Sequence, residues 1–191
     1  VVESELQEIK ENYGDNRRTE ILATHLDLNE EDLIVREEMV VTLSGEGYAK
    51  AQPLSDYHAQ RRGGKGRVAT RTKQDDFVKS MFVANSHDTI LCFSNYGKVY
   101  WLRVYQLPQA GRQARGRPLV NLLPLGAQER ITAFLPLGKD LQGQFVFMST
   151  AEGIVKKCSL ESFSRPRPSG LRALTLSEGD ELVSAGMTQG N

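Results

Sequence analysis

Residues 90–100 read ILCFSNYGKVY, an apolar β-prone run, a glycine turn at Gly97 and a second β-prone run. This order predicts a β-hairpin. The same pattern recurs without a gap as VVTLSGEGYAK at residues 40–50 and as VFMSTAEGIVK at residues 146–156. The shared glycines Gly47, Gly97 and Gly153 are 50 and 56 residues apart. Repeats of this length are typical of propeller-like blades.

Each predicted hairpin is followed by the same two features. A basic connection rich in glycine or proline comes first, at residues 60–66, 111–118 and 165–170. An apolar strand flanked by acids follows, at residues 77–84, 131–137 and 182–187. We therefore expect a mainly β, propeller-like repeat of antiparallel blades with three copies, over residues 37–87, 88–142 and 143–191.

Residues 1–36 differ from the repeats. Apolar side chains recur at helical steps from Val2 to Tyr13, which predicts a helix over residues 1–12 that Gly14 ends. Residues 22–36 are acid-rich and weakly patterned, as in a linker. The zero net charge of the chain hides an asymmetry: residues 1–38 hold twelve acids and four bases (−8), and residues 39–191 hold twelve acids and twenty bases (+8). We expect a basic domain that follows an acidic N-terminal segment.

The first connection, QRRGGKG at residues 60–66, places three cations among three glycines. Glycine lets a ligand approach the backbone closely, and arginine and lysine bind phosphate oxygens. No acid lies between Asp56 and Asp75. A solvated glycine turn is the plain alternative. A Walker-type nucleotide loop is excluded, because Gly66 follows Lys65 where serine or threonine must bind magnesium.

The heptapeptide QRRGGKG resembles, at all seven positions, the box that marks the C-terminal DNA-wrapping domain of the bacterial DNA gyrase A subunit. Residues 13–21 resemble the end of the breakage–reunion core of that protein. The paralogous topoisomerase IV protein carries a degraded or missing box, so the intact box favours gyrase. The resemblance implies a β-pinwheel, with four-stranded blades linked by exchanged strands. Since that family usually has five or six blades, we expect this chain to be truncated, with an open last blade.

The resemblance also implies a function. The domain would bind, bend and wrap duplex DNA without catalysis and without reading sequence, in support of negative supercoiling. The implied partners are double-stranded DNA and, in a heterotetramer, the rest of the gyrase A subunit with the gyrase B subunit, in the bacterial cytoplasm at the nucleoid. It implies no cofactor in this chain, because ATP and magnesium belong to other parts of the parent enzyme. A topoisomerase IV type domain and a propeller-like protein-interaction module remain as alternatives.

Basic residues stand in acid-free stretches of the repeats, whereas ordinary surfaces intersperse the two signs. If equivalent loops meet at one rim of stacked blades, their cations form a band that neutralises phosphates and holds a bent duplex. The predicted DNA-binding residues are Gln60, Arg61, Arg62, Gly63, Gly64, Lys65, Gly66, Arg67, Arg71, Lys73, Lys98, Arg103, Arg112, Arg115, Arg117, Lys156, Lys157, Arg165, Arg167 and Arg172.

We expect no catalytic site and no metal site. The three histidines lie in different segments without a serine or cysteine partner in a known motif. None of the six tyrosines stands in a motif that resembles the Arg-Tyr active-site pair of type IIA topoisomerases. Acids before the last strand of a repeat are predicted to be solvated strand ends rather than metal ligands: Asp75, Asp76, Glu178, Asp180 and Glu181.

Two cysteines, Cys92 and Cys158, are far apart and lack a CxxC partner. They suit a reducing cytoplasm, and we expect both to be small buried hydrophobic residues. Nothing in the sequence resembles a signal peptide, and no apolar run approaches the length that spans a membrane.

Overall fold

The computed structural model describes residues 2–15, 18–19, 30–57, 76–111, 113–138 and 142–190. The chain divides into two compact units, Val1–Leu33 and Ile34–Asn191. The first unit contains helix α1 (Val2–Tyr13), which buries none of its residues, and the 3-10 turn η1 (Glu30–Leu33). The amide of Gly14 donates to the carbonyl of Lys10 at 2.9 Å, so α1 ends where the sequence predicts.

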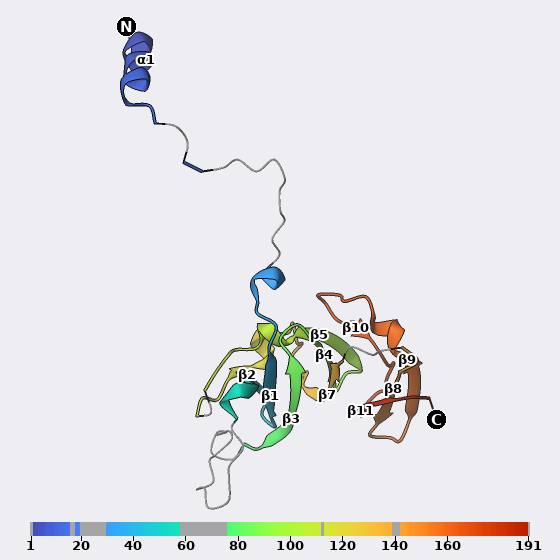
Figure 1. The fold of residues 1–191 in the computed structure, drawn as a ribbon. Coiled ribbons are helices and arrows are strands. Elements are labelled where there is room, and N and C mark those ends of the chain that lie inside the picture. The colour runs from blue at the N-terminus through green and yellow to red at the C-terminus, as the bar shows by residue number, and fades with distance from the viewer. Residues whose placement is uncertain are drawn as a thin grey trace, which may run out of the picture. The chain divides into compact units, whose positions relative to one another are not determined.

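The second unit consists of three antiparallel sheets, termed blades 1, 2 and 3 (Figure 1). Blade 1 has the strand order β3-β1-β2-β6, blade 2 the order β10-β5-β4-β7 and blade 3 the order β11-β8-β9. The strands are β1 (Glu38–Ser44), β2 (Tyr48–Pro53), β3 (Val78–Asn85), β4 (Thr89–Ser94), β5 (Lys98–Arg103), β6 (Arg117–Pro118), β7 (Ile131–Leu137), β8 (Phe145–Thr150), β9 (Val155–Ser159), β10 (Leu171–Arg172) and β11 (Leu182–Thr188). The 3-10 turns are η2 (Leu54–Asp56), η3 (Val104–Gln106), η4 (Leu119–Asn121) and η5 (Leu160–Phe163).

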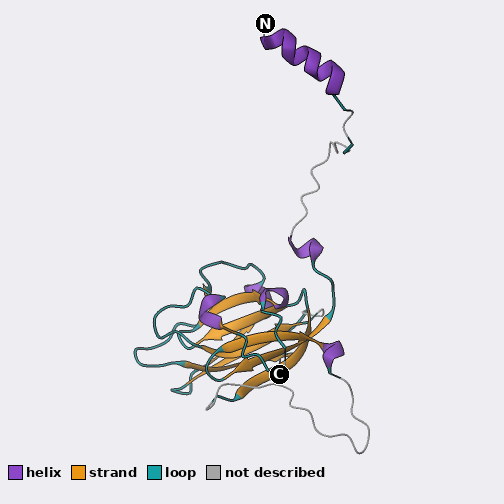
Figure 2. Cartoon of the chain, turned by 90° about the vertical axis from the view of Figure 1, so that its left-hand side faces the viewer, coloured by secondary structure: helices purple, strands orange, loops and turns teal. Residues whose placement is uncertain are grey.

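The mainly β prediction is confirmed, since strands form the body of this unit and the short helical turns lie at its margin (Figure 2). The three predicted hairpins are β1–β2, β4–β5 and β8–β9. Their glycines Gly47, Gly97 and Gly153 occupy equivalent turns with φ of 85°, 70° and 86°. Each glycine amide donates to the residue that ends the preceding strand, at 3.0–3.1 Å. In the described part of the chain, no helix is long and apolar enough to cross a membrane.

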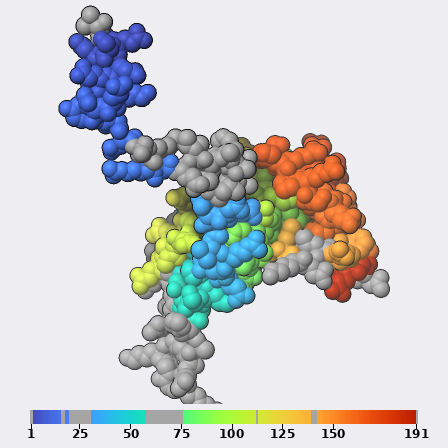
Figure 3. All heavy atoms as spheres, turned by 45° about the horizontal axis from the view of Figure 1, so that its top comes forward, coloured from blue at the N-terminus to red at the C-terminus, as the bar shows by residue number. Residues whose placement is uncertain are grey.

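The blades are stacked so that blade 2 is buried on both faces. Along β4, Ile90 and Cys92 join the apolar cluster shared with blade 1. Leu91 and Phe93 point the other way, into the cluster shared with blade 3. Figure 3 shows the two outer blades at opposite ends of this unit. Burying a side chain of this size stabilises the fold by about 1.5–3 kcal/mol, so the stacked faces are the main source of stability.

Each of the first two blades receives an edge strand from the following repeat. Strand β6 pairs with β2 of blade 1, and β10 pairs with β5 of blade 2. Gly116 and Gly170 precede these strands with φ of 87° and 77°. A Cβ on Gly116 would lie 2.2 Å from the carbonyl oxygen of Ala49, and one on Gly170 would lie 2.6 Å from the Tyr100 ring. Glycine is therefore needed at both positions.

Among the described residues, blade 3 has three strands and none from a later repeat. Phe147 of β8 holds the place that the fully buried Leu91 holds in β4, yet Phe147 is 43% exposed. Val155, on the same face of β9, is 58% exposed, and Lys157 stands directly opposite Phe147. The outer face of blade 3 thus carries exposed apolar side chains and a lysine, and no described residues cover it as blade 3 covers the same face of blade 2.

The three turn glycines differ in their surroundings. A Cβ on Gly97 would lie 2.5 Å from the carbonyl oxygen of Leu174, whereas nothing lies within 4 Å of a Cβ on Gly153. We predict that Gly153→Ala lowers the free energy of unfolding by about 1–2 kcal/mol through its positive φ alone. Gly97→Ala should cost about 1–3 kcal/mol more, because it also displaces the segment from the next repeat. Urea unfolding of the two variants checks this, and equal costs would contradict it.

Candidate nucleic-acid interface

The structure describes nine of the twenty predicted DNA-binding residues. The box Gln60–Gly66, Arg67, Arg71, Lys73 and Arg112 lie outside the described residues. Those described are cations on the connections between blades and cations on strands β5, β9 and β10. The two groups differ in what their charged ends contact.

The connection arginines that the structure describes lie on two segments. Arg115 and Arg117 belong to the second connection, and Arg165 and Arg167 belong to the third; all four are exposed. In the described ranges, the ion pairs are Arg18–Asp15 and Arg130–Glu181, so none of the connection arginines has a carboxylate partner. Arg165 and Arg167 line a hollow together with Ser162, Ser164 and the acidic Glu161, although no ion pair joins Glu161 to either arginine in the described ranges. Guanidinium groups with hydroxyls beside them suit phosphate oxygens.

A like-charged pair extends this surface onto the sheet of blade 2. Arg172 of β10 stands directly opposite Lys98 of β5. Like charges at directly opposite positions are unfavourable by themselves, and a bound anion would relieve their repulsion. Arg172 and Lys98 face each other because β10, which comes from the third repeat, forms the edge strand of blade 2.

Three of the predicted residues hold the protein itself together. The guanidinium of Arg103 donates to the carbonyl of His87 at 2.9 Å and to the hydroxyl of Thr89 at 3.0 Å. Lys156 donates to the carbonyl of Ala173 at 2.7 Å. Lys157 donates to the carbonyl of Gly190 at 2.6 Å, and its ammonium lies 5.1 Å from the centroid of the Phe145 ring. Both lysines remain exposed, so each ammonium retains donors for a further acceptor.

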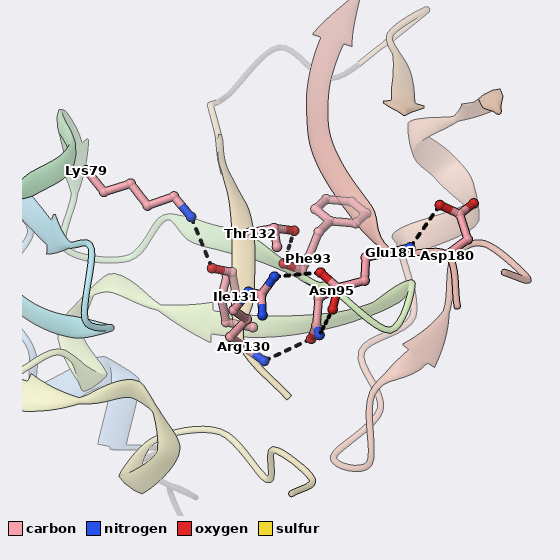
Figure 4. A network of polar contacts seen from close by, with 8 residues as sticks. All are labelled: Lys79, Phe93, Asn95, Arg130, Ile131, Thr132, Asp180 and Glu181. Carbon is pink, nitrogen blue, oxygen red and sulfur yellow. Dashed lines mark hydrogen bonds and ion pairs between the residues drawn. The ribbon is translucent and has the colours of Figure 1, made fainter. Parts of the chain in front are cut away.

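Sequence reasoning passed over three other cations. Lys50 is 2% exposed and donates to the carbonyl of Ala114 at 2.9 Å, and its burial lowers its pKa. Lys79 donates to the carbonyl of Ile131 at 3.3 Å. Burial, and then the nearby charge of Arg130, lowers the pKa of Lys79. Arg130 itself bonds Glu181 of blade 3 (Figure 4). Position in the repeat did not signal Lys50, since the same offset from the turn glycine holds Tyr100 in the second repeat and Lys156 in the third.

Asp76 and Asp180 are not solvated strand ends, so the prediction is wrong for these two acids, whereas Glu178 is exposed. Oδ1 of Asp180, which is 6% exposed, accepts bonds from the amides of Glu152 at 3.1 Å and Glu181 at 2.9 Å. Oδ1 of Asp76 accepts the same two bonds in blade 1, from Glu46 at 3.0 Å and Phe77 at 2.8 Å. Each carboxylate therefore joins a hairpin turn to the start of the third strand.

Hydrogen bonds shift the pKa of both carboxyls. Burial alone would raise the pKa of Asp76, but bonds from the Ser44 hydroxyl and from backbone amides outweigh it, and the pKa is lowered. The pKa of Asp180 is lowered in the same way, by the Thr150 hydroxyl and backbone amides acting against burial. Charged acceptors are therefore the favoured form at neutral pH.

Blade 2 has a glutamate in the equivalent place. Glu129, which is 5% exposed, accepts a bond from the amide of Gly126 at 2.8 Å. It also accepts the Tyr100 hydroxyl at 3.0 and 3.1 Å. Burial, with the bond to and the charge of Glu129, raises the pKa of Tyr100 to about 12. This pair lies in the interior and is not part of the basic surface.

The structure tests the cysteine prediction residue by residue. Cys92 is fully buried and burial raises the pKa of its thiol, as expected of a small hydrophobic residue. Cys158 is only half-buried, although burial raises its pKa too. Both thiols are free. Within the described ranges, no group of three histidine, cysteine, aspartate or glutamate side chains could hold a metal ion.

Stacked antiparallel blades with exchanged edge strands, and exposed arginines on the connections between them, define a propeller-like repeat domain with a basic surface. The family described as "DNA gyrase C-terminal domain, beta-propeller" matches residues 38–85, 88–137 and 144–189. The chain belongs to this family.

Curated relatives agree with this assignment. The DNA gyrase A subunit of Salmonella typhimurium is 57% identical over 191 residues, which cover 100% of this chain and 22% of that protein. The DNA gyrase A subunit of Haemophilus influenzae is 58% identical over the same length, again 100% of this chain and 22% of that protein. The chain therefore spans about a fifth of the length of these relatives.

Solved structures resemble the fold. The crystal structure of the C-terminal domain of DNA topoisomerase IV superposes with a TM-score of 0.69 at 26% identity, over 82% of this chain and 47% of that one. The structure of the DNA gyrase A C-terminal domain superposes with a TM-score of 0.59 at 26% identity, over 80% of this chain and 48% of that one.

The lowered pKa values of Asp76 and Asp180 predict acid sensitivity. Each carboxylate stabilises the fold above the ordinary aspartate pKa of about 4, and this stabilisation is lost as the pH falls through the lower folded-state pKa. The double variant Asp76→Asn/Asp180→Asn should be less stable than the wild type at pH 7, and the gap should close in acid. Urea unfolding at pH 7 and in acid measures the difference in stability between the variant and the wild type. The exposed Glu178→Gln is the control, and a gap of constant size would contradict the prediction.

Proposed function

We propose that this chain is a non-catalytic module that binds, bends and wraps duplex DNA without reading its sequence, in support of negative supercoiling by a gyrase. One observation carries the proposal: exposed arginines stand on successive blade connections and have no carboxylate partner in the described part of the chain. Phosphates would neutralise these charges and release condensed counterions, which is the main source of sequence-independent DNA affinity.

The repetition of the blades supports bending as well as binding. The second and third connections each lead to an edge strand of the preceding blade. Their cations therefore recur at corresponding places of a stack rather than in one patch. We expect a duplex that contacts both of these connections to bend, with the deformation energy offset by contacts along its path.

Family membership supports the place of the module in a larger enzyme. The curated relatives are named as the A subunit of DNA gyrase. The intact QRRGGKG at residues 60–66 points the same way. The proposal includes as partners the rest of the A subunit together with a B subunit, in an ATP-dependent type IIA topoisomerase of the bacterial cytoplasm.

A topoisomerase IV type domain is the second candidate. It is favoured by the higher TM-score of the topoisomerase IV domain, 0.69 against 0.59 for the gyrase A domain. The box favours gyrase, because the resemblance associates it with that enzyme. A protein-interaction module remains as an alternative of another class, and it predicts no salt-dependent affinity for duplex DNA.

Replacement of Arg115, Arg117, Arg165, Arg167 and Arg172 by alanine tests the connection surface. If each arginine neutralises one phosphate, the slope of log K against log salt should fall in magnitude by about 4–5, at about 0.9 per contact. Duplexes of unrelated sequence should give the same slope. Fluorescence anisotropy at several salt concentrations measures it. An unchanged slope would remove the connections from the DNA interface.

The box tests wrapping separately from affinity. In the complete enzyme, replacement of residues 60–66 by alanine should abolish the introduction of negative supercoils and leave ATP-driven relaxation and decatenation, which need strand passage but no wrap. A plasmid topology gel beside the intact enzyme reads the result. Arg165→Ala/Arg167→Ala is the matched control, since it removes two cations but keeps the box. A box variant that still supercoils efficiently would overturn the gyrase assignment.

A further inference from the structure

Asn95, in the hairpin turn of blade 2, makes two hydrogen bonds within blade 2 and two to blade 3; Figure 4 shows it beside Arg130 and Glu181. Within blade 2, its amide donates to the carbonyl of Arg130 and its Oδ1 accepts from the amide of Arg130, both at 2.9 Å. Toward blade 3, its carbonyl accepts from the amide of Leu182 at 2.9 Å, and its Nδ2 donates to Oε1 of Glu181 at 3.3 Å. Because Asn95 is 1% exposed, these bonds hold it in one orientation.

The ion pair between Arg130 and Glu181 closes this network. The guanidinium of Arg130 lies 2.5 Å from Oε2 of Glu181. The two residues hold equivalent places in successive blades, each directly before the residue that opens the third strand, since Ile131 pairs with Ser94 and Leu182 with Thr150. The ion pair therefore links one repeat to the next instead of bracing a single repeat.

We call the interface between two neighbouring blades a seam. The seam between blades 1 and 2 has different polar contacts from the seam between blades 2 and 3. Gly45 and Phe77 stand there in the places of Asn95 and Arg130, and Lys79 supplies a bond to the carbonyl of Ile131 instead. A neutral bond from the indole of Trp101 to the carbonyl of Phe163, at 2.8 Å, also crosses the seam between blades 2 and 3. Apolar contact fills this seam but has no preferred direction, so the directional bonds set how the two blades face each other.

We propose that Asn95, Arg130 and Glu181 are positioning residues for DNA: their network fixes the angle between blades 2 and 3, and thereby the curvature of the duplex path, without contacting phosphate. The proposal rests on the proposed function. The charge of Arg130 is neutralised by Glu181, whereas the connection arginines have no such partner in the described ranges. Arg130 therefore contributes geometry to the basic surface, and the connection arginines contribute phosphate binding.

Hydrogen exchange of the Leu182 amide tests the seam without DNA. This amide bonds across the seam to Asn95, so its exchange reports opening between the two blades. In the full chain, Arg130→Met and Glu181→Gln should each speed its exchange by about two- to fivefold, because the lost ion pair is exposed and therefore of modest strength. The charge swap Arg130→Glu/Glu181→Arg restores the ion pair but removes the acceptor of Asn95 Nδ2, so it should return only part of the lost protection. Both side chains are partly exposed, so these variants should keep the fold.

Measurements of duplex binding and bending distinguish a positioning role of Arg130 from a direct contact of Arg130 with phosphate. Energy transfer between dyes at the duplex ends should show a straighter bound duplex for Arg130→Met and for Glu181→Gln, and partial recovery with the charge swap, which restores the ion pair alone. The slope of log K against log salt should stay unchanged, whereas a phosphate contact at Arg130 would lower its magnitude by about 0.9. Arg165→Met is the matched control: it should lower the slope and leave Leu182 exchange as in the wild type.

Three results would overturn the proposal. Unchanged Leu182 exchange in both single variants would show that the network does not hold the seam. Faster Leu182 exchange with an unchanged bend of the bound duplex would show that the angle between blades 2 and 3 does not set the curvature of the DNA. A slope lowered by about 0.9 in Arg130→Met would make Arg130 a phosphate ligand. If the wild-type chain bound no duplex at all, the proposed function would fail, and the exchange data alone would still decide whether the network holds the seam.

Discussion

The structure depends on the burial of blade 2 on both faces. Alternate residues of β4 enter two different apolar clusters, Ile90 and Cys92 toward blade 1 and Leu91 and Phe93 toward blade 3. A register slip by one residue would exchange the two sets, so the pairing of β4 with β5 and β7 is strongly specified. Blade 2 could not form this fold alone, because its apolar side chains on each face are covered by a neighbouring blade.

Apolar stacking leaves the edges and turns of the blades to be held by other contacts. Edge strands β6 and β10 come from the following repeat and pair with blades 1 and 2. Gly116 and Gly170 allow the chain to pass close to the Ala49 carbonyl and the Tyr100 ring at these places. Carboxylates stabilise two of the hairpin turns: Asp76 in blade 1 and Asp180 in blade 3 accept hydrogen bonds from backbone amides of these turns. Such local bonds give a non-directional core a defined geometry.

The arginines of this chain show that one residue type serves three purposes, according to its neighbours. Arg103 donates to groups of its own blade and stabilises the sheet. Arg130 pairs with Glu181 across a seam. Arg165 on the third connection is exposed and has no carboxylate partner in the described ranges. Charge count alone treats the three alike, and only their partners separate structural cations from those available to an anion.

The sequence by itself determined the repeats, the hairpins and the turn glycines, because strand pairing and positive φ depend on local residue patterns of short range. It also marked the basic connections, since charge is visible in composition. Tertiary structure alone decided which of the described cations pair with the protein itself, where Asp180 points and how Asn95, Arg130 and Glu181 meet. Residues 95, 130 and 181 are far apart in the chain and are brought together only by blade stacking. Local pattern carries no information about such contacts, since they depend on how one repeat is placed against the next.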